Sequence, residues 1–157
     1  MRQSRLVPDT LAGAVHVPDR CGAVPVSRAM LDNEARRLWD ELPSGGVVWL
    51  SGELGAGKTT FVQAIVAAAG GGAARSPTYA LVHEYASPHG PLFHADCYRL
   101  RNPEEALDLD FPDLVRRGRL VLIEWPERAG RYAPPPHVHV KLAHAGIPED
   151  RLFERIA

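Results

Sequence analysis

Two short, continuous runs of apolar residues stand out along the chain. Val47 to Leu50 lie between a glycine pair and a further glycine, and Leu120 to Ile123 are followed directly by an acidic residue. Continuous apolar runs of this length are typical of strands that are covered on both faces, as in a parallel sheet. The pattern therefore predicts two buried strands at the centre of a sheet.

Helical periodicity flanks the first of these strands. Ser27 is placed to cap a helix in which apolar residues recur every three or four positions, until proline and glycine end it at residues 43–46. Lys58 to Ala69 form a second helical pattern, which three glycines end. Further strands are expected at residues 23–26, 79–85, 92–95, 138–142 and 152–156, and short helices near residues 103–106 and 113–117. Strands that alternate with helices predict an α/β fold with a mixed β-sheet.

Length and composition limit the kinds of protein to which this chain can belong. The 157 residues predict one domain over residues 23–157, preceded by a loosely ordered extension over residues 1–22. The net charge of −1 excludes a general nucleic-acid or membrane coat, which would need a strong basic excess. Cys21 and Cys97 form no CxxC pair and are expected to be free thiols. No apolar run reaches the roughly 18 residues that span a bilayer, so a cytoplasmic protein without membrane contact is expected.

The segment between the first buried strand and the second helix carries the clearest chemical signal. Gly52-Glu53-Leu54-Gly55-Ala56-Gly57-Lys58-Thr59 fits G-x-x-x-x-G-K-[ST] at every fixed position, with a strand before it and a helix after it. Glycines let backbone N–H groups wrap around a phosphate, and the helix N-terminus adds positive potential. Lys58 is expected to neutralise β- and γ-phosphate oxygens, and the Thr59 hydroxyl to bind Mg²⁺.

Two acidic residues are candidates for the metal and water side of this site. Glu124 follows the second buried strand, where a metal-side carboxylate is expected, although a solvated charge at a strand end is the alternative. Asp96, in the segment His94-Ala95-Asp96-Cys97-Tyr98-Arg99, could position water, hold a metal-bound water or orient Lys58. The alternative for Asp96 is a surface pair with an arginine. The hydroxyls of Ser76 to Tyr79 could form a loop that closes over a γ-phosphate, or only begin a strand.

In combination these motifs resemble a known family. Five motifs follow one another in this order: the phosphate loop with Thr60, Ser76-Pro77-Thr78-Tyr79, His94-x-Asp96-x-Tyr98-Arg99-Leu100, Pro103-Glu104-Glu105 and Leu122-Ile123-Glu124-Trp125-Pro126. Over residues 24–156 the chain is similar to the small bacterial ATPases of tRNA threonylcarbamoyladenosine biosynthesis, the TsaE (YjeE) family.

The resemblance implies a P-loop NTPase-like three-layer fold, binding of ATP and Mg²⁺, and slow intrinsic hydrolysis of ATP. It implies partners of the TsaD and TsaB type, the transferase complex that modifies the adenosine beside the anticodon, with tRNA contacted only through that complex. By resemblance, Lys58, Asp96 and Glu124 are the catalytic candidates, and Thr59 and Glu124 the metal candidates. The nucleotide would be held by residues 53–60, with Thr60 on the α-phosphate side.

The resemblance also implies an aromatic residue beside the metal, Trp125. Met30-Leu31 stands where family members often carry Thr-Leu near the adenine, and residues 25–27 are the other candidates for that contact. Beyond Lys58, no arginine is placed by a motif where it must act on the phosphates.

Two other functions fit the same motifs. A small-molecule P-loop kinase would need an arginine-rich lid and an acceptor pocket, and no lid-like insertion is visible in the sequence. A non-catalytic adaptor, in which ATP only joins the partners, shares every motif with the ATPase. Single-turnover hydrolysis of ATP, with and without the partners, separates these possibilities.

Overall fold

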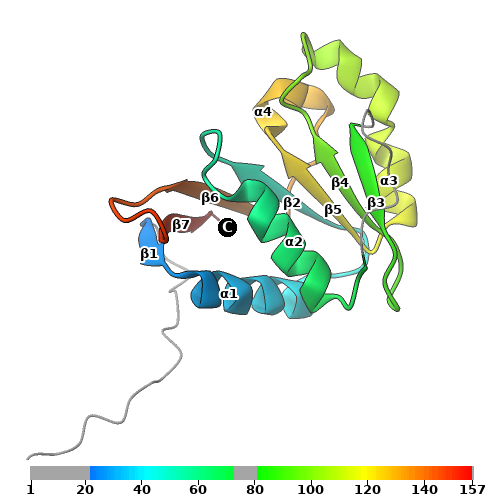
Figure 1. Cartoon of the computed structure of the whole chain (residues 1–157). Helices are drawn as coiled ribbons and strands as arrows, with labels where there is room; N and C mark the ends of the chain where they lie inside the picture. Colours follow the sequence, from blue (N-terminus) through cyan, green and yellow to red (C-terminus); the bar gives the residue numbers. More distant parts are fainter. Residues whose placement is uncertain (1–21, 73–80, 157) are drawn as a thin grey trace, which may run out of the picture.

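The computed structural model describes residues 22–72 and 81–156, and its elements build a seven-stranded mixed sheet between two layers of helices (Figure 1). The strands are β1 (Val24–Val26), β2 (Gly46–Ser51), β3 (Val82–Tyr85), β4 (Leu92–Asp96), β5 (Leu120–Glu124), β6 (Val138–His144) and β7 (Arg151–Ile156). The helices are α1 (Arg28–Glu41), α2 (Lys58–Ala68), α3 (Phe111–Arg117) and α4 (Pro126–Ala129), with 3-10 helices η1 (Pro103–Leu109) and η2 (Gly130–Tyr132).

The strand order explains why the two apolar runs are continuous. The sheet runs β1-β7-β6-β2-β5-β4-β3, and β2, β5, β4 and β6 are parallel to their neighbours in this central part. The other strands, β1, β7 and β3, pair antiparallel with their neighbours at the two ends. The predicted mixed α/β sheet is therefore confirmed. The short edge strand with Pro25 and the hairpin that β3 and β4 form are also as expected.

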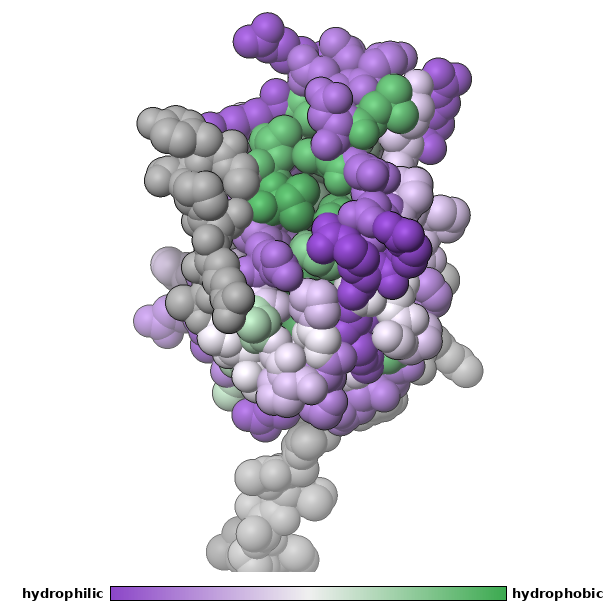
Figure 2. Space-filling view, turned by 90° about the vertical axis from the view of Figure 1, so that its right-hand side faces the viewer, coloured by the Kyte–Doolittle hydropathy of each residue, from purple (hydrophilic) through white to green (hydrophobic). Residues whose placement is uncertain are grey.

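Each face of the sheet carries its own hydrophobic cluster. Helices α1 and α2 cover one face, where Leu38, Phe61 and Leu122 are fully buried. Helix α3 and η1 lie on the other side (Figure 1), where Phe93, Phe111 and Ile123 are buried. Figure 2 looks at the β3 side of the molecule and shows apolar residues gathered in the upper part of that face. Both faces of the sheet are therefore covered by packed apolar side chains.

The ends of α1 show how local sequence sets the elements. The Ser27 hydroxyl accepts a hydrogen bond from the Met30 N–H at 3.3 Å, which is the predicted N-cap. The apolar spacing then buries Leu31, Ala35 and Leu38 on one side of the helix. The helix therefore begins and ends near the positions that its sequence predicts.

Some expectations fall outside the part of the chain that the structure describes. Residues 1–21 of the expected extension, which include Cys21, lie outside the described residues. The segment Ser76 to Tyr79 also lies outside them, so the expectations for both segments remain predictions. Cys97 is a free thiol, as expected, and it is buried, which raises its pKa to about 12. Within residues 22–72 and 81–156, no helix is both long and apolar enough to cross a membrane.

Candidate functional site

Three parallel strands end at the same edge of the sheet, and the candidate residues meet there. The chain leaves β2 at Ser51 and enters the glycine-rich loop, residues 52–59. Strand β5 ends at Glu124, which lies directly opposite Asp96, the last residue of β4. Because β2 pairs in parallel with β5, the loop emerges beside both carboxylates. Ligand sites of open α/β sheets form at this carboxyl edge.

Two glycines fix the path of the loop. A Cβ atom on Gly52 would lie 2.0 Å from the Leu142 carbonyl oxygen of β6, so a side chain has no room there. Gly57 precedes α2 with φ 101°, a left-handed conformation that favours glycine, and no side chain caps the helix. The first N–H groups of α2 have no partner within the helix, so its positive end is available to an anion.

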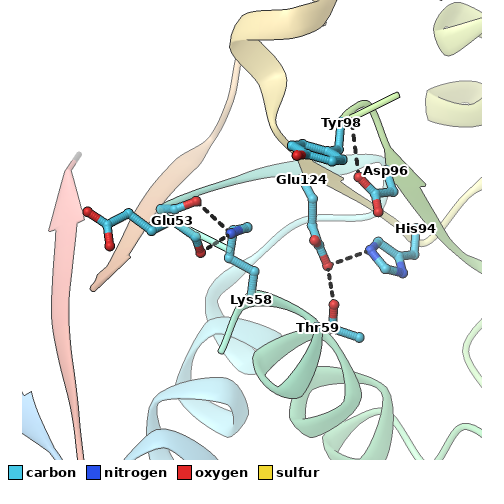
Figure 3. A network of polar contacts seen from close by, with 8 residues as sticks. Glu53, Lys58, Thr59, His94, Asp96, Tyr98 and Glu124 are labelled. Carbon is cyan, nitrogen blue, oxygen red and sulfur yellow. Dashed lines mark hydrogen bonds and ion pairs between the residues drawn. The ribbon is translucent and has the colours of Figure 1, made fainter. Parts of the chain in front are cut away.

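Lys58 is the most buried cation of the site. The side chain is 4% exposed, and its Nζ donates to the Gly52 carbonyl at 2.6 Å and to the Glu53 carbonyl at 2.7 Å. The ammonium also lies 4.6 Å from the centre of the Trp125 ring. Burial lowers the pKa of Lys58 below its ordinary value, although Glu124 and Asp96 oppose this shift. Figure 3 shows that the Glu53 carboxylate points away, so Glu53 contributes its backbone.

Glu124 lies at the centre of a small polar network (Figure 3). Its Oε1 accepts from the Thr59 hydroxyl at 3.0 Å and from His94 Nε2 at 2.9 Å. Because a carboxylate only accepts, a proton of the His94 ring lies on Nε2, and the buried Nδ1 has no hydrogen-bond partner among the described residues. Burial alone would raise the pKa of Glu124, but the bonds from His94 and Thr59, together with the charges of His94 and Lys58, outweigh it and lower the pKa. The site therefore holds an ionised carboxylate beside a hydroxyl.

A cleft of about 260 Å³, here called the first cleft, unites most of the sequence-predicted residues. It is lined by Leu54, Gly55, Gly57, Lys58, Thr59, Thr60, Asp96, Tyr98, Glu124, Trp125 and Arg151. Of residues 53–60, Asp96 and Glu124, which the sequence assigns to the phosphates, the metal and catalysis, all but Glu53 and Ala56 line this cleft. Glu53 reaches Lys58 through its carbonyl, and Ala56 is buried in the core beneath the loop.

Asp96 lines the first cleft without a cationic partner among the described residues. Its Oδ1 accepts from the Tyr98 N–H at 3.0 Å, which shapes the turn after β4. A surface ion pair with an arginine, the alternative considered from sequence, is not formed within the described residues. The Glu124 carboxylate thus accepts hydrogen bonds from the Thr59 and His94 side chains, whereas the Asp96 carboxylate accepts one from a backbone N–H.

Three contacts of the site do not follow from the sequence motifs, although the resemblance does imply an aromatic residue at Trp125. His94 shares a motif with Asp96, but its bond to Glu124 depends on how β4 is placed against β5. Trp125 has a left-handed backbone (φ 55°), and its ring contacts the tilted ring of Tyr98, with the ring centres 5.0 Å apart and Arg128 over both rings. Arg151 comes from β7, where no motif marks it.

A second cleft of about 290 Å³ adjoins the first. It is lined by Val26, Ser27, Arg28, Leu31, Gly57, Thr60, Pro148, Glu149 and Arg151. Gly57, Thr60 and Arg151 line both clefts and so lie where the two adjoin. Residues 26–27, candidates for the adenine contact, and Leu31 therefore lie beside the glycine-rich loop, at the end remote from Glu124.

The sheet order, the glycine-rich loop at the end of β2 and the carboxylate at the end of β5 define a P-loop NTPase-like α/β fold. A crystal structure of YdiB from Bacillus subtilis has the same fold, with a TM-score of 0.62 and 22% identity over 87% of this chain and 88% of that one. The family model for the threonylcarbamoyl adenosine biosynthesis protein TsaE matches residues 26–152. The chain belongs to the TsaE family, and its role lies in the biosynthesis of threonylcarbamoyladenosine in tRNA.

Curated relatives agree with this assignment. The tRNA threonylcarbamoyladenosine biosynthesis protein TsaE of Rickettsia typhi is 37% identical over 70% of this chain and 77% of its own length. The proteins of the same name from Haemophilus influenzae and from a Nostoc species are 37% and 38% identical, over 61% and 68% of each chain. The resemblance seen in the sequence motifs is therefore confirmed at the level of the family.

Proposed function

We propose that the protein is a Mg²⁺-dependent ATPase whose hydrolysis of ATP serves the threonylcarbamoyl-modification of tRNA. The observation that carries the proposal is the joint position of Lys58 and of the Thr59–Glu124 pair in one cleft, at the uncapped start of α2. A buried ammonium, free helix N–H groups and a hydroxyl beside a carboxylate match the needs of a phosphate chain that carries a metal ion.

The two clefts suggest how the nucleotide lies. The phosphates would occupy the first cleft, with the β- and γ-phosphate oxygens at Lys58 and the backbone of residues 53–60 around the chain. The adenosine would extend past Thr60 into the second cleft, beside Ser27 and Leu31. This orientation puts the end of the phosphate chain at Glu124 and Asp96, where hydrolysis has to take place.

The residues beside Glu124 fit a Mg²⁺ ion. The Thr59 hydroxyl and the Glu124 carboxylate are hard oxygen donors, and their oxygens lie 3.0 Å apart. Among the described residues, no three His, Cys, Asp or Glu side chains are grouped to form a metal site by themselves. Proteins usually bind Mg²⁺ with one or two carboxylates, completed by substrate phosphates and water. Once bound, the ion would neutralise charge on the phosphate oxygens.

In the proposed reaction a water molecule attacks the γ-phosphorus, the bond to the β–γ bridging oxygen breaks, and ADP and phosphate leave. Asp96 is the residue that would orient this water, because its carboxylate lines the cleft and forms no ion pair with another described residue. Lys58 would hold the phosphate oxygens, and His94 and Thr59 would keep Glu124 in place. Hydrolysis by the chain alone is expected to be slow, since the cleft is open at its rim.

The rim of the first cleft supports a role for partners. Leu54 is 61% exposed and Tyr98 is 37% exposed, and the ring of Tyr98 contacts the ring of Trp125. Exposed apolar and aromatic side chains beside a functional cleft are typical of contact surfaces. We expect the transferase subunits of the TsaD and TsaB type to bind here and to stimulate hydrolysis. Contact with tRNA would be indirect, through that complex, and the family's role in tRNA modification favours a cytoplasmic location.

Single-turnover hydrolysis tests the proposal against its two alternatives. Radiolabelled ATP is followed with the chain alone and with the purified transferase pair. The ATPase predicts release of inorganic phosphate that the pair accelerates. An adaptor predicts tight nucleotide binding with no release in either mixture. A small-molecule kinase predicts that label appears in an organic acceptor, supplied as a cell metabolite extract, instead of in inorganic phosphate.

A further inference from the structure

Arg151 lies against the glycine-rich loop although it is distant from it in sequence. It is the first residue of β7, and its side chain passes over Gly57, the last glycine before α2. A Cβ atom built on Gly57 would lie 3.4 Å from Arg151 Nε and 3.7 Å from its Cδ. The guanidinium group is therefore next to the start of α2, where the helix N–H groups are uncapped.

The position of Arg151 is fixed by backbone groups. The strand pairings place it opposite Val26 of β1 and opposite His144 of β6. Its Nη1 donates to the Pro148 carbonyl at 2.7 Å and to the Asp150 carbonyl at 2.9 Å. These bonds hold one side of the guanidinium in the turn between β6 and β7. A side chain held in this way loses little entropy when a ligand binds.

The remaining donors of Arg151 are available to an anion. Within residues 22–72 and 81–156, no carboxylate forms an ion pair with Arg151, and Nε and Nη2 have no protein partner. Arginine presents several N–H donors in one plane, which suits phosphate oxygens. A half-buried guanidinium beside an uncapped helix start gives this end of the cleft a positive potential of its own.

Arg151 also marks the junction of the two clefts. It lines both of them, together with Gly57 and Thr60. Lys58 and Glu124 line only the first cleft, and Ser27 lines only the second. A ligand that occupies both clefts would therefore lie next to Arg151, Gly57 and Thr60 where the clefts meet.

We infer that Arg151 binds the α-phosphate of the nucleotide, at the point where the phosphate chain joins the adenosine; this inference rests on the proposed function. Arg151 would act on the part of the ligand that ATP and ADP share, while Lys58, Glu124 and Asp96 act on the outer phosphates. Arg151 is thus a nucleotide-binding residue supplied by the β6–β7 hairpin, and it is distinct from an arginine that stabilises charge on the γ-phosphate.

Calorimetric titration with Mg-ATP and with Mg-ADP tests this assignment. Arg151→Gln removes the charge and keeps a similar length, and Arg151→Lys keeps the charge without the planar group. Arg116→Gln is the matched control, because Arg116 is an exposed arginine on α3 that pairs with Asp113. Thermal unfolding of each variant sets a temperature at which all of them are folded.

We expect Arg151→Gln to weaken the binding of ATP and of ADP by the same factor, about 10- to 100-fold, which is the range for loss of a charge-assisted hydrogen bond. Arg151→Lys should recover part of the loss, and Arg116→Gln should bind like the parent. Unchanged affinity in Arg151→Gln would overturn the inference, and a loss for ATP alone would assign Arg151 to the γ-phosphate instead. If the parent itself binds neither nucleotide, the proposed function fails, which is a different result from either of these.

Discussion

The charge of Glu124 is predicted to stabilise the fold, and replacing Glu124 with glutamine isolates that effect. Glutamine keeps the shape of the side chain and an oxygen that accepts from His94 and Thr59, but it cannot ionise. In the parent, the two hydrogen bonds end on a buried carboxylate. Because these bonds lower the pKa of Glu124, the folded state favours the ionised form.

The size of the effect follows from the two bonds. A hydrogen bond to a charged group contributes about 1.5–3 kcal/mol to stability, against about 0.5–1.5 kcal/mol between neutral groups. Exchanging the charged acceptor of these two bonds for a neutral one therefore costs about 2 kcal/mol, which the easier burial of an amide partly offsets. At pH 7 we expect Glu124→Gln to be less stable than the parent by about 1–2 kcal/mol.

The effect has a defined dependence on pH. The folded pKa of Glu124 lies below its unfolded value of about 4.5, so the stabilisation is fully present above pH 4.5 and is lost as the pH falls through the folded pKa. Urea unfolding of parent and Glu124→Gln at pH 7 and at successively lower pH values measures it. The difference between the two proteins should narrow below pH 4.5. If the difference in free energy of unfolding stays constant with pH, or if the variant is more stable than the parent at pH 7, the charge of Glu124 does not stabilise the fold.

Three further changes test neighbouring parts of the site. Lys58→Ala should abolish detectable ATP binding by calorimetry, because it removes the only cation buried beside the loop among the described residues; an undiminished affinity would contradict the loop's role. Thr59→Ala should weaken Mg²⁺-dependent turnover at least 10-fold more than Mg²⁺-free nucleotide binding, since it removes a proposed metal ligand; equal losses in both assays would remove Thr59 from the metal site. Gly52→Ala should lower the free energy of unfolding by about 2 kcal/mol or more, because its Cβ would lie 2.0 Å from the Leu142 carbonyl oxygen; a parent-like urea midpoint would contradict this packing.

Much of the fold was predictable because its signals are local. The apolar runs at Val47–Leu50 and Leu120–Ile123 became the neighbouring strands β2 and β5. The cap at Ser27 and the glycines around Lys58 fixed where α1 and α2 begin. The proximity of Glu124 to Thr59 also follows from sequence, since parallel strands end at one edge of the sheet.

Other contacts could not be predicted, because they depend on pairing between distant segments. The bond from His94 to Glu124 exists because β4 is aligned so that Asp96 lies opposite Glu124. Arg151 reaches Gly57 only because β7 pairs with both β1 and β6, which no local pattern indicates. The contact between Lys58 and the Trp125 ring accompanies a left-handed backbone at a residue type that rarely adopts one.

The most direct test of a partner-activated ATPase compares ATP hydrolysis by the parent and by Asp96→Asn, each alone and with the transferase pair. Threonylcarbamoylation of tRNA is measured in the same mixtures. Asparagine keeps the bond to the Tyr98 N–H but lacks the charge proposed to orient water. We expect slow hydrolysis by the parent alone and clear stimulation by the pair. Asp96→Asn should bind ATP nearly as the parent does, but it should not be stimulated and should not support modification. Equal stimulation of parent and variant would remove Asp96 from the mechanism, and no stimulation of the parent would contradict a partner-activated ATPase.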